Sequence, residues 1–420
     1  MSWEVRPGSG TDDASGLEVS GGVAGVAALH ADLLALAWEY DEAAERMRGW
    51  AARGAAALVD PDLLASGLLS PLTLAAAEAQ VLAATSGPDG VAVESLAWEA
   101  DAAALRTTAG LLLDADRLAS AGLDRLLLPL GVVLVGAPLW VPPAAGVLAR
   151  LYPDGSPVVR PVPGVAVPAS HTAPRSVRDL VEHLRQLSAL SPPDAPARNG
   201  TFELQTLTTT DGARRHVLLL PGTDDMTTLP WTRDGDARDM GANLALVGGV
   251  PDDVTDGVLD ALVDAGVGRD PVLVVGHSQG GMVAAALLAR ADEHGLSIRH
   301  AVTLGSPTGQ LPGVPAGSQV LSLEHRGDVV PRLDGGANPD SLEQVTVSFG
   351  PVAEDGSRGG LEVLADRHGF AAYAEGASLV DASDHPSVRT QLTELRRAGF
   401  LDPADGTAVS SRLLQVVRER

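Results

Sequence analysis

The sequence predicts a two-part protein, an all-α helical module followed by an α/β domain with a parallel sheet. Two observations carry this prediction. Apolar side chains near the N-terminus recur at alternating intervals of three and four residues, which is the spacing of a helix packed on another helix. After residue 200, short apolar strand segments alternate with helical segments, as in a parallel sheet with helices on both faces. The chain has 420 residues, enough for two or three domains.

The composition is that of an acidic globular protein. Hydrophobic residues make up 45% of the chain and charged residues 20%. The formal net charge is −24, and all 30 basic residues are arginine. Because contacts to phosphates need a basic patch, this balance argues against a nucleic-acid partner. The absence of cysteine excludes disulfides and thiolate chemistry.

The helical module is predicted to span residues 21–125, after a loose arm over residues 1–20 that is rich in Gly, Ser and Asp. Second and third helices are expected over Pro71–Thr85 and Val91–Leu118. The apolar stripe of the first helix consists of Val26, Leu29, Leu33, Leu36, Tyr40, Ala43, Met47 and Trp50.

The segment that follows, residues 126–150, is apolar. Leu126–Ala149 carries no charge over 24 residues, and a helix of about 20 apolar residues can cross a bilayer. Four prolines in the segment would break a straight helix, so we favour a buried apolar hairpin over membrane contact. Residues 151–175 are proline-rich and are expected to form a linker. The α/β domain is then predicted over residues 176–405, and a C-terminal helix over residues 406–420.

The α/β domain is organised around the stretch PVLVVGHSQGGMVAAALLAR, Pro271–Arg290. Val272–Val275 has the apolar, β-branched character of a buried parallel strand, and Met282–Arg290 is rich in helix formers. Between them lies Gly-His-Ser-Gln-Gly, with Ser278 at its centre. A serine on a sharp strand-to-helix turn is held in strained backbone with its hydroxyl exposed, and small residues are needed two positions before and after it. We therefore interpret Ser278 as a nucleophile.

A serine nucleophile needs a base and a group that orients the base, and in enzymes with this strand–serine–helix arrangement the acid and then the histidine follow the serine along the chain. For the acid we favour Asp328, in the loop just after the predicted strand Val320–Leu323, over Asp334 in an Asp-Gly-Gly turn.

Four downstream histidines compete for the role of the base. His368 comes late in the chain, after the strand-like segment Leu361–Asp366, and is the preferred candidate. His385, at the start of a helix, is the second choice. His300 opens a strand, and His325 lies too close to Asp328 in sequence to face it.

Two backbone amides are expected to form an oxyanion hole. One is the N–H of Gln279, the residue after the nucleophile. The other belongs to the loop after the preceding strand, Pro221-Gly222-Thr223, where we favour the amide of Thr223; its hydroxyl is an additional candidate contact.

With these residues in place, the C-terminal half resembles the α/β-hydrolase superfamily and, within it, the class 3 lipase-like serine esterases. The resemblance rests on five motifs in the expected order, namely PGT, GHSQGG, TLGSP, GDVVP and HGFAAY. It implies hydrolysis of a carboxylic ester or lipid through a Ser-Asp-His triad and an acyl-enzyme, without metal or cofactor. One departure is the sequence LPGTDDM, where many class 3 lipases have an arginine before Gly-Thr. Asp224 and Asp225 would disfavour anionic substrates if they face the site.

The helical module resembles the WXG-like helical hairpins of type VII secretion substrates, although Trp50 is followed by Ala51-Ala52 and no W-x-G is present. This resemblance implies an alternative function, a secreted effector or interaction protein whose helical half is the export or partner module. The N-terminal residues MSWEVRPGSGTDD lack the basic and apolar regions of a Sec signal peptide. A cytoplasmic location and export by a leaderless route are therefore both expected possibilities.

Overall fold

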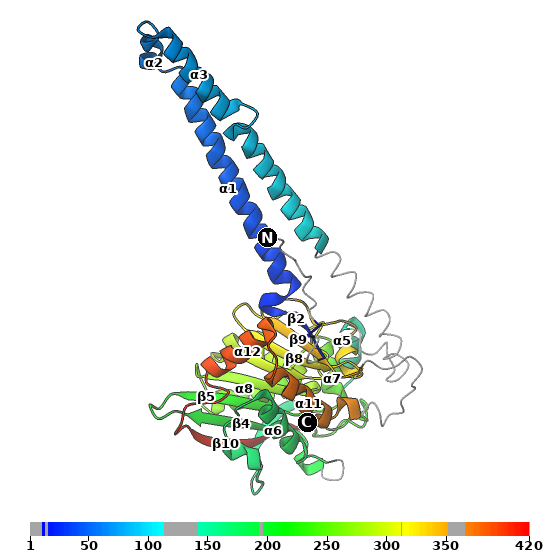
Figure 1. Ribbon diagram of the computed structural model, residues 1–420. Helices are drawn as coiled ribbons and strands as arrows, with labels where there is room; N and C mark the ends of the chain where they lie inside the picture. The colour runs from blue at the N-terminus through cyan, green and yellow to red at the C-terminus, as the bar shows by residue number, and fades with distance from the viewer. Residues whose placement is uncertain are drawn as a thin grey trace. The chain divides into compact units, whose positions relative to one another are not determined.

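The computed structural model describes residues 11–12, 16–112, 142–153, 155–192, 196–311, 313–351 and 366–419. The chain divides into two units. One comprises Ala27–Leu118, and the other comprises Met1–Val26 with Ala119–Arg420. The first unit is helical and the second is an α/β unit (Figure 1), which confirms the predicted fold class.

The helical unit is built from a long helix and shorter helices that run back along it. Its elements are α1 (Val26–Leu58), α2 (Pro61–Ser66), α3 (Pro71–Ser86) and a helix over residues 91–112. The ring of Tyr40 on α1 packs on Trp98 with centroids 4.9 Å apart. Ion pairs from Arg48 to Glu99 and from Arg106 to Asp41 also join α1 to the helix over 91–112.

The fully buried apolar side chains described in this unit are alanines, and two large residues of the predicted stripe are exposed. Ala37 and Ala44 on α1 and Ala102 on the opposite helix are fully buried, whereas Leu36 is 40% and Trp50 52% exposed. Small side chains let two helices approach closely, and Ala37 is buried one position after the predicted Leu36. The predicted stripe is therefore wrong at Leu36 and Trp50.

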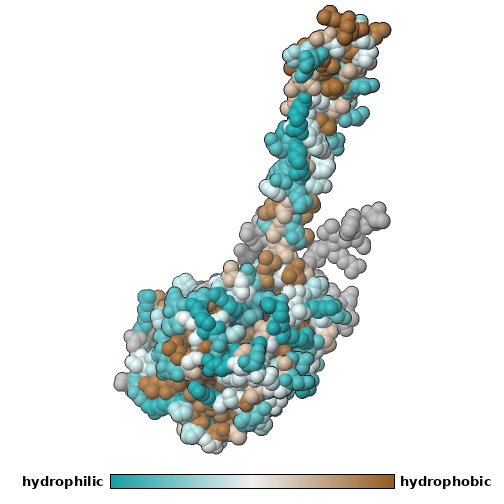
Figure 2. All heavy atoms as spheres, turned by 90° about the vertical axis from the view of Figure 1, so that its left-hand side faces the viewer, coloured by the Kyte–Doolittle hydropathy of each residue, from teal (hydrophilic) through white to brown (hydrophobic). Residues whose placement is uncertain are grey.

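Large apolar side chains are also exposed where α1 gives way to α2 and α3. Figure 2 shows hydrophobic residues gathered at this end of the helical unit. Leu68 and Leu69 are each 91% exposed, and Leu72 is 85% exposed. The unit thus buries few of its leucines within itself.

The α/β unit contains a ten-stranded sheet within the described residues, in the order β1-β2-β9-β8-β7-β6-β5-β4-β10-β3. The five strands β5 to β9 are parallel to one another, and the strands flanking them on both sides are antiparallel. The strands are β1 (Thr11–Asp12), β2 (Leu17–Gly21), β3 (Ser156–Pro161), β4 (Thr201–Thr208), β5 (Arg214–Leu220), β6 (Pro271–His277), β7 (Ser297–Leu304), β8 (Gln319–His325), β9 (Gln344–Phe349) and β10 (Ala408–Glu419).

Helices cover both faces of this sheet (Figure 1). Alternate strand residues supply two separate cores: Val272 and Val274 of β6 belong to one, Leu273 and Val275 to the other. The helices on the first face are α5 (Pro142–Ala149), α7 (Met240–Val247), α8 (Asp253–Asp264) and α9 (Gln279–Arg290); those on the second are α6 (Val177–Ser188), α11 (Phe370–Asp381) and α12 (Pro386–Arg397).

The two chain ends contribute strands that the sequence analysis did not predict. The predicted C-terminal helix over residues 406–420 is wrong, because Ala408–Glu419 form β10. Its first eight residues pair with β4 and its last six with β3. The run LLQVVRE suits a helix locally, and pairing with strands far away in sequence overrides that preference. These pairings also place β4 inside the sheet and not at its edge.

The predicted arm and linker also contain ordered strands. Leu17–Gly21, expected within the loose arm over residues 1–20, form β2 and pair with β9. Ser156–Pro161, expected within the linker over residues 151–175, form β3 and pair with β10. Both strands lie near the sheet edges, where proline and glycine are tolerated.

The apolar segment 126–150 is described only in part, since residues 126–141 lie outside the described residues. Pro142–Ala149 form α5, which belongs to the α/β unit; Ala145 is fully buried there, and Gly146 lies against Gly248 at the end of α7. Among the described helices, none is both long and apolar enough to cross a membrane.

Candidate active site

Ser278 occupies the turn between β6 and α9 in a strained backbone conformation. Its φ is +53° and its ψ −119°, and it is one of two described non-glycine residues with positive φ. A positive φ is unfavourable for a residue with a Cβ atom, so this conformation persists only where the surrounding structure imposes it. The amide of Ser278 donates a hydrogen bond to the carbonyl of Leu304, at the end of β7, over 2.9 Å.

Three glycines make room for this turn. A Cβ atom on Gly276 would lie 2.2 Å from the carbonyl oxygen of Gly280. A Cβ on Gly280 would lie 2.0 Å from the carbonyl oxygen of Leu220, and one on Gly281 would lie 2.0 Å from Ser306 Oγ. Since such distances are far inside van der Waals contact, the strand and helix can meet at Ser278 only without these side chains.

Asp328 and His368 form a hydrogen-bonded pair. The Nδ1 atom of His368 lies 2.7 Å from Asp328 Oδ2. The side chain of Asp328 is 1% exposed and that of His368 22% exposed. Asp328 Oδ1 accepts a hydrogen bond from the amide of Val330 over 3.0 Å. The Asp328 contact makes Nδ1 the protonated nitrogen and leaves Nε2 of His368 as the acceptor.

Two further side chains hold this pair, and the sequence analysis did not identify their contacts. The hydroxyl of Tyr373 donates to Asp328 Oδ2 over 2.7 Å. Nε2 of His277 lies 2.9 Å from the carbonyl oxygen of His368, and the two imidazole rings are 4.5 Å apart. Burial, with His368 alongside, lowers the pKa of His277 to about 3. His277 therefore stays neutral and donates to a backbone carbonyl.

Ser278 and His368 line the same cavity, whose volume is about 250 Å³. None of the described residues that line it is Asp, Glu or Arg. Its apolar walls come from Met226, Met282, Pro307, Val330, Leu333 and Phe370. Thr223, Asn243 and Ser188 add polar groups. The site thus combines an uncharged, largely apolar cavity with a few convergent polar atoms, as ligand sites do.

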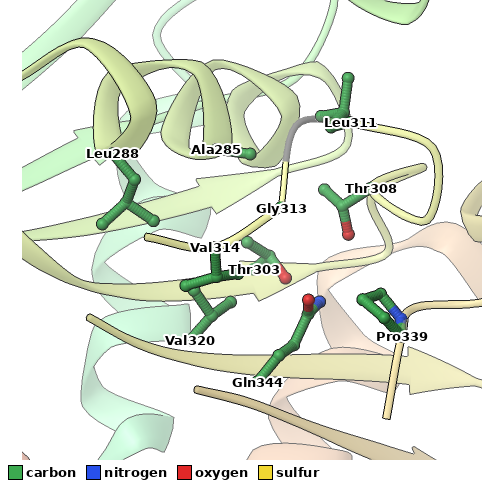
Figure 3. A pocket seen from close by; sticks show the side chains of 10 residues that line it. All are labelled: Ala285, Leu288, Thr303, Thr308, Leu311, Gly313, Val314, Val320, Pro339 and Gln344. Carbon is green, nitrogen blue, oxygen red and sulfur yellow. The ribbon is translucent and has the colours of Figure 1, made fainter. Parts of the chain in front are cut away.

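A second cavity lies under α9 and is much smaller. Its volume is about 20 Å³, enough for about one water molecule. Thr303, Val320 and Gln344 are among its lining residues, and none of those shown is titratable (Figure 3). Among the described residues, its lining has no titratable side chain that could act as a base for the Thr303 or Thr308 hydroxyl, so the larger cavity is the candidate active site.

The predicted oxyanion residues both lie beside Ser278. Gln279 is the first residue of α9, where amides have no acceptor within the helix. Thr223 lines the cavity, and a Cβ on the preceding Gly222 would lie 3.0 Å from Ser278 Cβ. The structure therefore brings together Ser278, Asp328, His368, Thr223 and Gln279 at the carboxyl ends of β5, β6 and β8.

The other candidates lie elsewhere. Asp334 accepts hydrogen bonds from the amides of Gln310 and Gly336 and stabilises a turn. His385 is the residue before α12, His300 packs on Phe400, and His325 packs on Phe349. None of these three histidines lines the cavity. The segment Leu361–Asp366, used to favour His368, lies outside the described residues except for Asp366.

The acidic pair after Thr223 does not face the cavity. Asp224 is paired with Arg238 over 2.7 Å and accepts the amide hydrogen of Gly200 over 2.6 Å. Asp225 accepts hydrogen bonds from Thr227 and Thr228. Both carboxylates are engaged in contacts that hold the loop, and neither lines the cavity.

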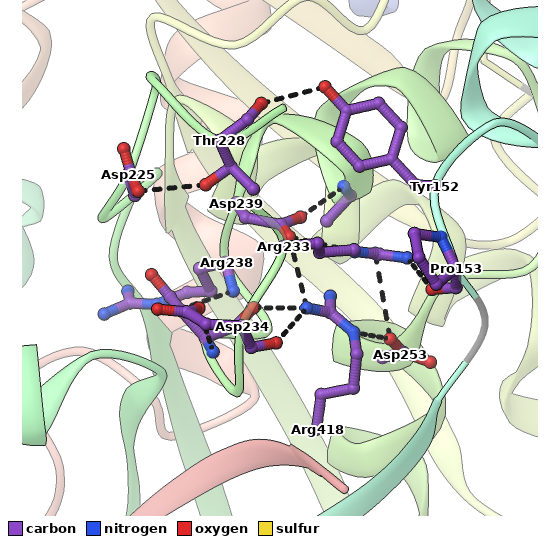
Figure 4. Close-up of polar contacts among 12 residues, drawn as sticks. Tyr152, Pro153, Asp225, Thr228, Arg233, Asp234, Arg238, Asp239, Asp253 and Arg418 are labelled. Atoms are coloured by element: carbon purple, nitrogen blue, oxygen red, sulfur yellow. Dashed lines mark hydrogen bonds and ion pairs between the residues drawn. The ribbon is translucent and has the colours of Figure 1, made fainter. Parts of the chain in front are cut away.

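A buried ionic cluster supports this loop, residues 221–239, which joins β5 to α7 (Figure 4). Arg233 Nε lies 3.0 Å and Arg418 Nη1 3.1 Å from Asp239 Oδ2. Arg418 also contacts Asp253 and donates to the carbonyl of Asp236 over 2.6 Å. Asp239 caps α7 through the amide of Ala242. The C-terminal strand thus holds the loop that carries Thr223.

A comparison with known families covers part of the chain that carries this site. Residues 256–347 match the model of the PGAP1-like alpha/beta domain. The matched region runs from α8 to β9 and contains Ser278 and Asp328. No curated protein and no solved structure matches the chain significantly. The match supports assignment of the α/β unit to the α/β-hydrolase superfamily.

The low pKa of His277 predicts a loss of stability in acid. The unfolded chain takes up a proton on this residue near pH 6.5, and the folded protein does so only near pH 3. The stability it contributes is therefore present above pH 6.5 and lost as the pH falls. As the pH falls from 7.5 to 5, the wild-type protein should lose about 2 kcal/mol more of its free energy of unfolding than the His277→Gln variant loses.

Urea unfolding at several pH values measures this effect. The same change at exposed His171 is the control for the substitution itself. A pH-independent difference between wild type and His277→Gln would contradict the account of His277 as a buried neutral imidazole.

Arg418 should be a main source of stability in the α/β unit. Its side chain is 2% exposed, and Arg418→Met leaves buried carboxylates short of a partner. We expect the free energy of unfolding to fall by about 3–5 kcal/mol. Arg412→Met, on the exposed part of the same strand, should change it by less than about 0.5 kcal/mol. Equal effects of both variants in chemical denaturation would rule out this role.

Proposed function

We propose that the α/β unit is a serine hydrolase of carboxylic esters that works through Ser278, Asp328 and His368. The observation that carries this proposal is the strained turn at Ser278, which opens into the same cavity as a histidine bonded to a buried aspartate. Strained backbone at a cavity is typical of a functional residue. The match of residues 256–347 to the PGAP1-like alpha/beta domain supports a hydrolase of the lipase or esterase type.

In the first step, His368 takes the proton from Ser278. The Asp328 contact favours the neutral tautomer of His368 with its hydrogen on Nδ1, so Nε2 is available to accept the serine proton as Oγ attacks the ester carbonyl. Asp328 then stabilises the imidazolium that forms. His277 and Tyr373 hold the histidine backbone and the carboxylate, so neither partner needs to reorient as the charge develops.

In the second step, the same groups release the products. The oxyanion of the tetrahedral intermediate accepts hydrogen bonds from the amides of Gln279 and Thr223. His368 returns its proton to the leaving alcohol, and the acyl group remains on Ser278. A water molecule then attacks this ester, with His368 as base once more, and frees the carboxylic acid.

The cavity favours a neutral substrate. Its walls are largely apolar, and the part of its lining that the structure describes has no Asp, Glu or Arg to pair with a charged group. Burying an unpaired charge there would be costly. An ester with an apolar acyl chain fits these walls, because it places apolar carbon against them and its carbonyl against the two amides.

Labelling with a fluorophosphonate probe tests the proposal. We expect one equivalent of label on the peptide that contains Ser278, since the probe reacts with an activated serine and mimics the tetrahedral intermediate. Ser278→Ala should abolish labelling, and Ser378→Ala, on the opposite face of the sheet, should not. Asp328→Asn should reduce ester hydrolysis by about 10⁴-fold while the protein stays folded.

Two outcomes of the labelling experiment would contradict the proposal. Label on another serine would overturn the assignment of the nucleophile. Folded, unlabelled wild-type protein with no hydrolysis of short-chain esters would mean that the fold is used for binding and not for catalysis.

A further inference from the structure

One buried amide, the side chain of Asn243, joins the two residues that carry the proposed oxyanion amides. Asn243 lies on α7, is 2% exposed and lines the cavity. Its Oδ1 accepts a hydrogen bond from Gln279 Nε2 over 2.9 Å. Its Nδ2 donates to Thr223 Oγ1 over 3.0 Å. Asn243 thus links the loop after β5 to the start of α9 through these two hydrogen bonds.

The two sides of this contact differ in how firmly the fold holds them. Gln279 begins a helix that packs on β6 and β7, and its side chain also donates to the carbonyl of Asp239 over 3.1 Å. Thr223 belongs to the loop over residues 221–239, which contains no helix and no extended strand. No described residue accepts a hydrogen bond from the Thr223 amide. The adjacent amide of Asp224 donates to the carbonyl of Arg238 over 2.9 Å. The direction of the Thr223 amide therefore depends on this backbone contact together with the side-chain contacts that Thr223 makes to Asn243.

The hydrogen bonds of Asn243 restrict the directions in which the Thr223 hydroxyl can donate. Because Nδ2 of Asn243 donates to Oγ1, the hydroxyl hydrogen is directed either to Asn243 Oδ1, 3.2 Å away, or into the cavity. The Sδ atom of Met226 lies 3.5 Å from the same Nδ2 and covers the amide on another side. When negative charge develops in the cavity, the hydroxyl can turn its hydrogen toward it without losing the Nδ2 bond.

We propose that Asn243 is a positioning residue that holds Thr223 and Gln279 in register with Ser278 and orients the Thr223 hydroxyl as a third oxyanion donor. This inference rests on the proposed function, since it concerns the same reaction. A donor misplaced by a fraction of an ångström stabilises the transition state less while ground-state binding changes little. Asn243 should therefore act on kcat more than on KM.

Steady-state hydrolysis of a short-chain p-nitrophenyl ester by the full chain tests this. Asn243→Leu, which keeps the shape of the side chain, should lower kcat about 10- to 100-fold with KM within about 3-fold. Thr223→Val removes the hydroxyl and keeps the backbone amide, and should lower kcat about 10-fold. The double variant should be at most about 3-fold slower than Asn243→Leu, because both changes remove the same interaction.

A charged variant and a remote control separate positioning from loss of stability. Asn243→Asp keeps the acceptor for Gln279 but places a negative charge beside the developing oxyanion, so its kcat should fall below that of Asn243→Leu. Gln205→Met removes a buried amide that makes three hydrogen bonds far from the cavity, on β4. It should lower the melting temperature without changing kcat. If Asn243→Leu does not fold, Thr223→Val and Asn243→Asp decide the question.

The experiments distinguish failure of the proposed function from failure of the role assigned to Asn243. Wild-type protein without labelling at Ser278 and without ester hydrolysis would overturn the proposed function. Active wild-type enzyme whose kcat is unchanged by Asn243→Leu, or whose double variant shows additive losses, would overturn the role of Asn243 alone.

Discussion

The strained backbone at Ser278 is the constraint on which the candidate site depends. A positive φ at a serine is unfavourable by itself, so the surrounding fold must impose it. Here the close approach of α9 to the ends of β5 and β6 does so, and three glycines permit that approach. The same packing sets the first amide of α9 and the loop after β5 beside the serine. The proposed nucleophile and the proposed oxyanion donors therefore share a single structural cause.

The remaining site residues lie on loops, and polar contacts fix them. Asp328 accepts hydrogen bonds from His368 and Tyr373 on Oδ2 and from the amide of Val330 on Oδ1, so both carboxylate oxygens are engaged. The loop over residues 221–239 is held by Asn243 at the cavity and by Arg233 and Arg418 beneath it. Since Arg418 lies at the end of β10, the last strand of the chain stabilises a loop that carries a proposed catalytic group.

The sequence was sufficient for features that depend on local pattern. The strand, turn and helix around Ser278 were predicted because apolar runs, glycine spacing and helix formers all lie within twenty residues. Asp328 and His368 followed from their order along the chain, and the structure places them in contact. Features that depend on distant partners were not predicted. β10 resembles a helix until β4 and β3 are beside it, and β2 resembles a loose arm until β9 is beside it.

Side-chain partners were the least predictable part of the site. Tyr373 lies in the HGFAAY motif used to place His368, yet nothing in that motif says that its hydroxyl reaches Asp328. Asn243 lies in an apolar helix, where a lone polar residue is the one local signal that it has a buried partner. In the helical unit, alanines are the fully buried apolar residues and the Tyr40–Trp98 pair packs beside them, a division that the spacing of apolar residues alone does not predict.

Pre-steady-state hydrolysis of an activated ester tests the central claim, covalent catalysis at Ser278, most directly. The account predicts a rapid release of about one equivalent of alcohol per protein, followed by a slower steady rate. Acid quenching within the burst should leave one acyl group on the protein, and peptide mapping should locate it on Ser278. The substrate should carry a bulky acyl chain, so that deacylation is slow. Steady hydrolysis of this substrate with no burst, and with no acyl group on the quenched protein, would contradict covalent catalysis at Ser278.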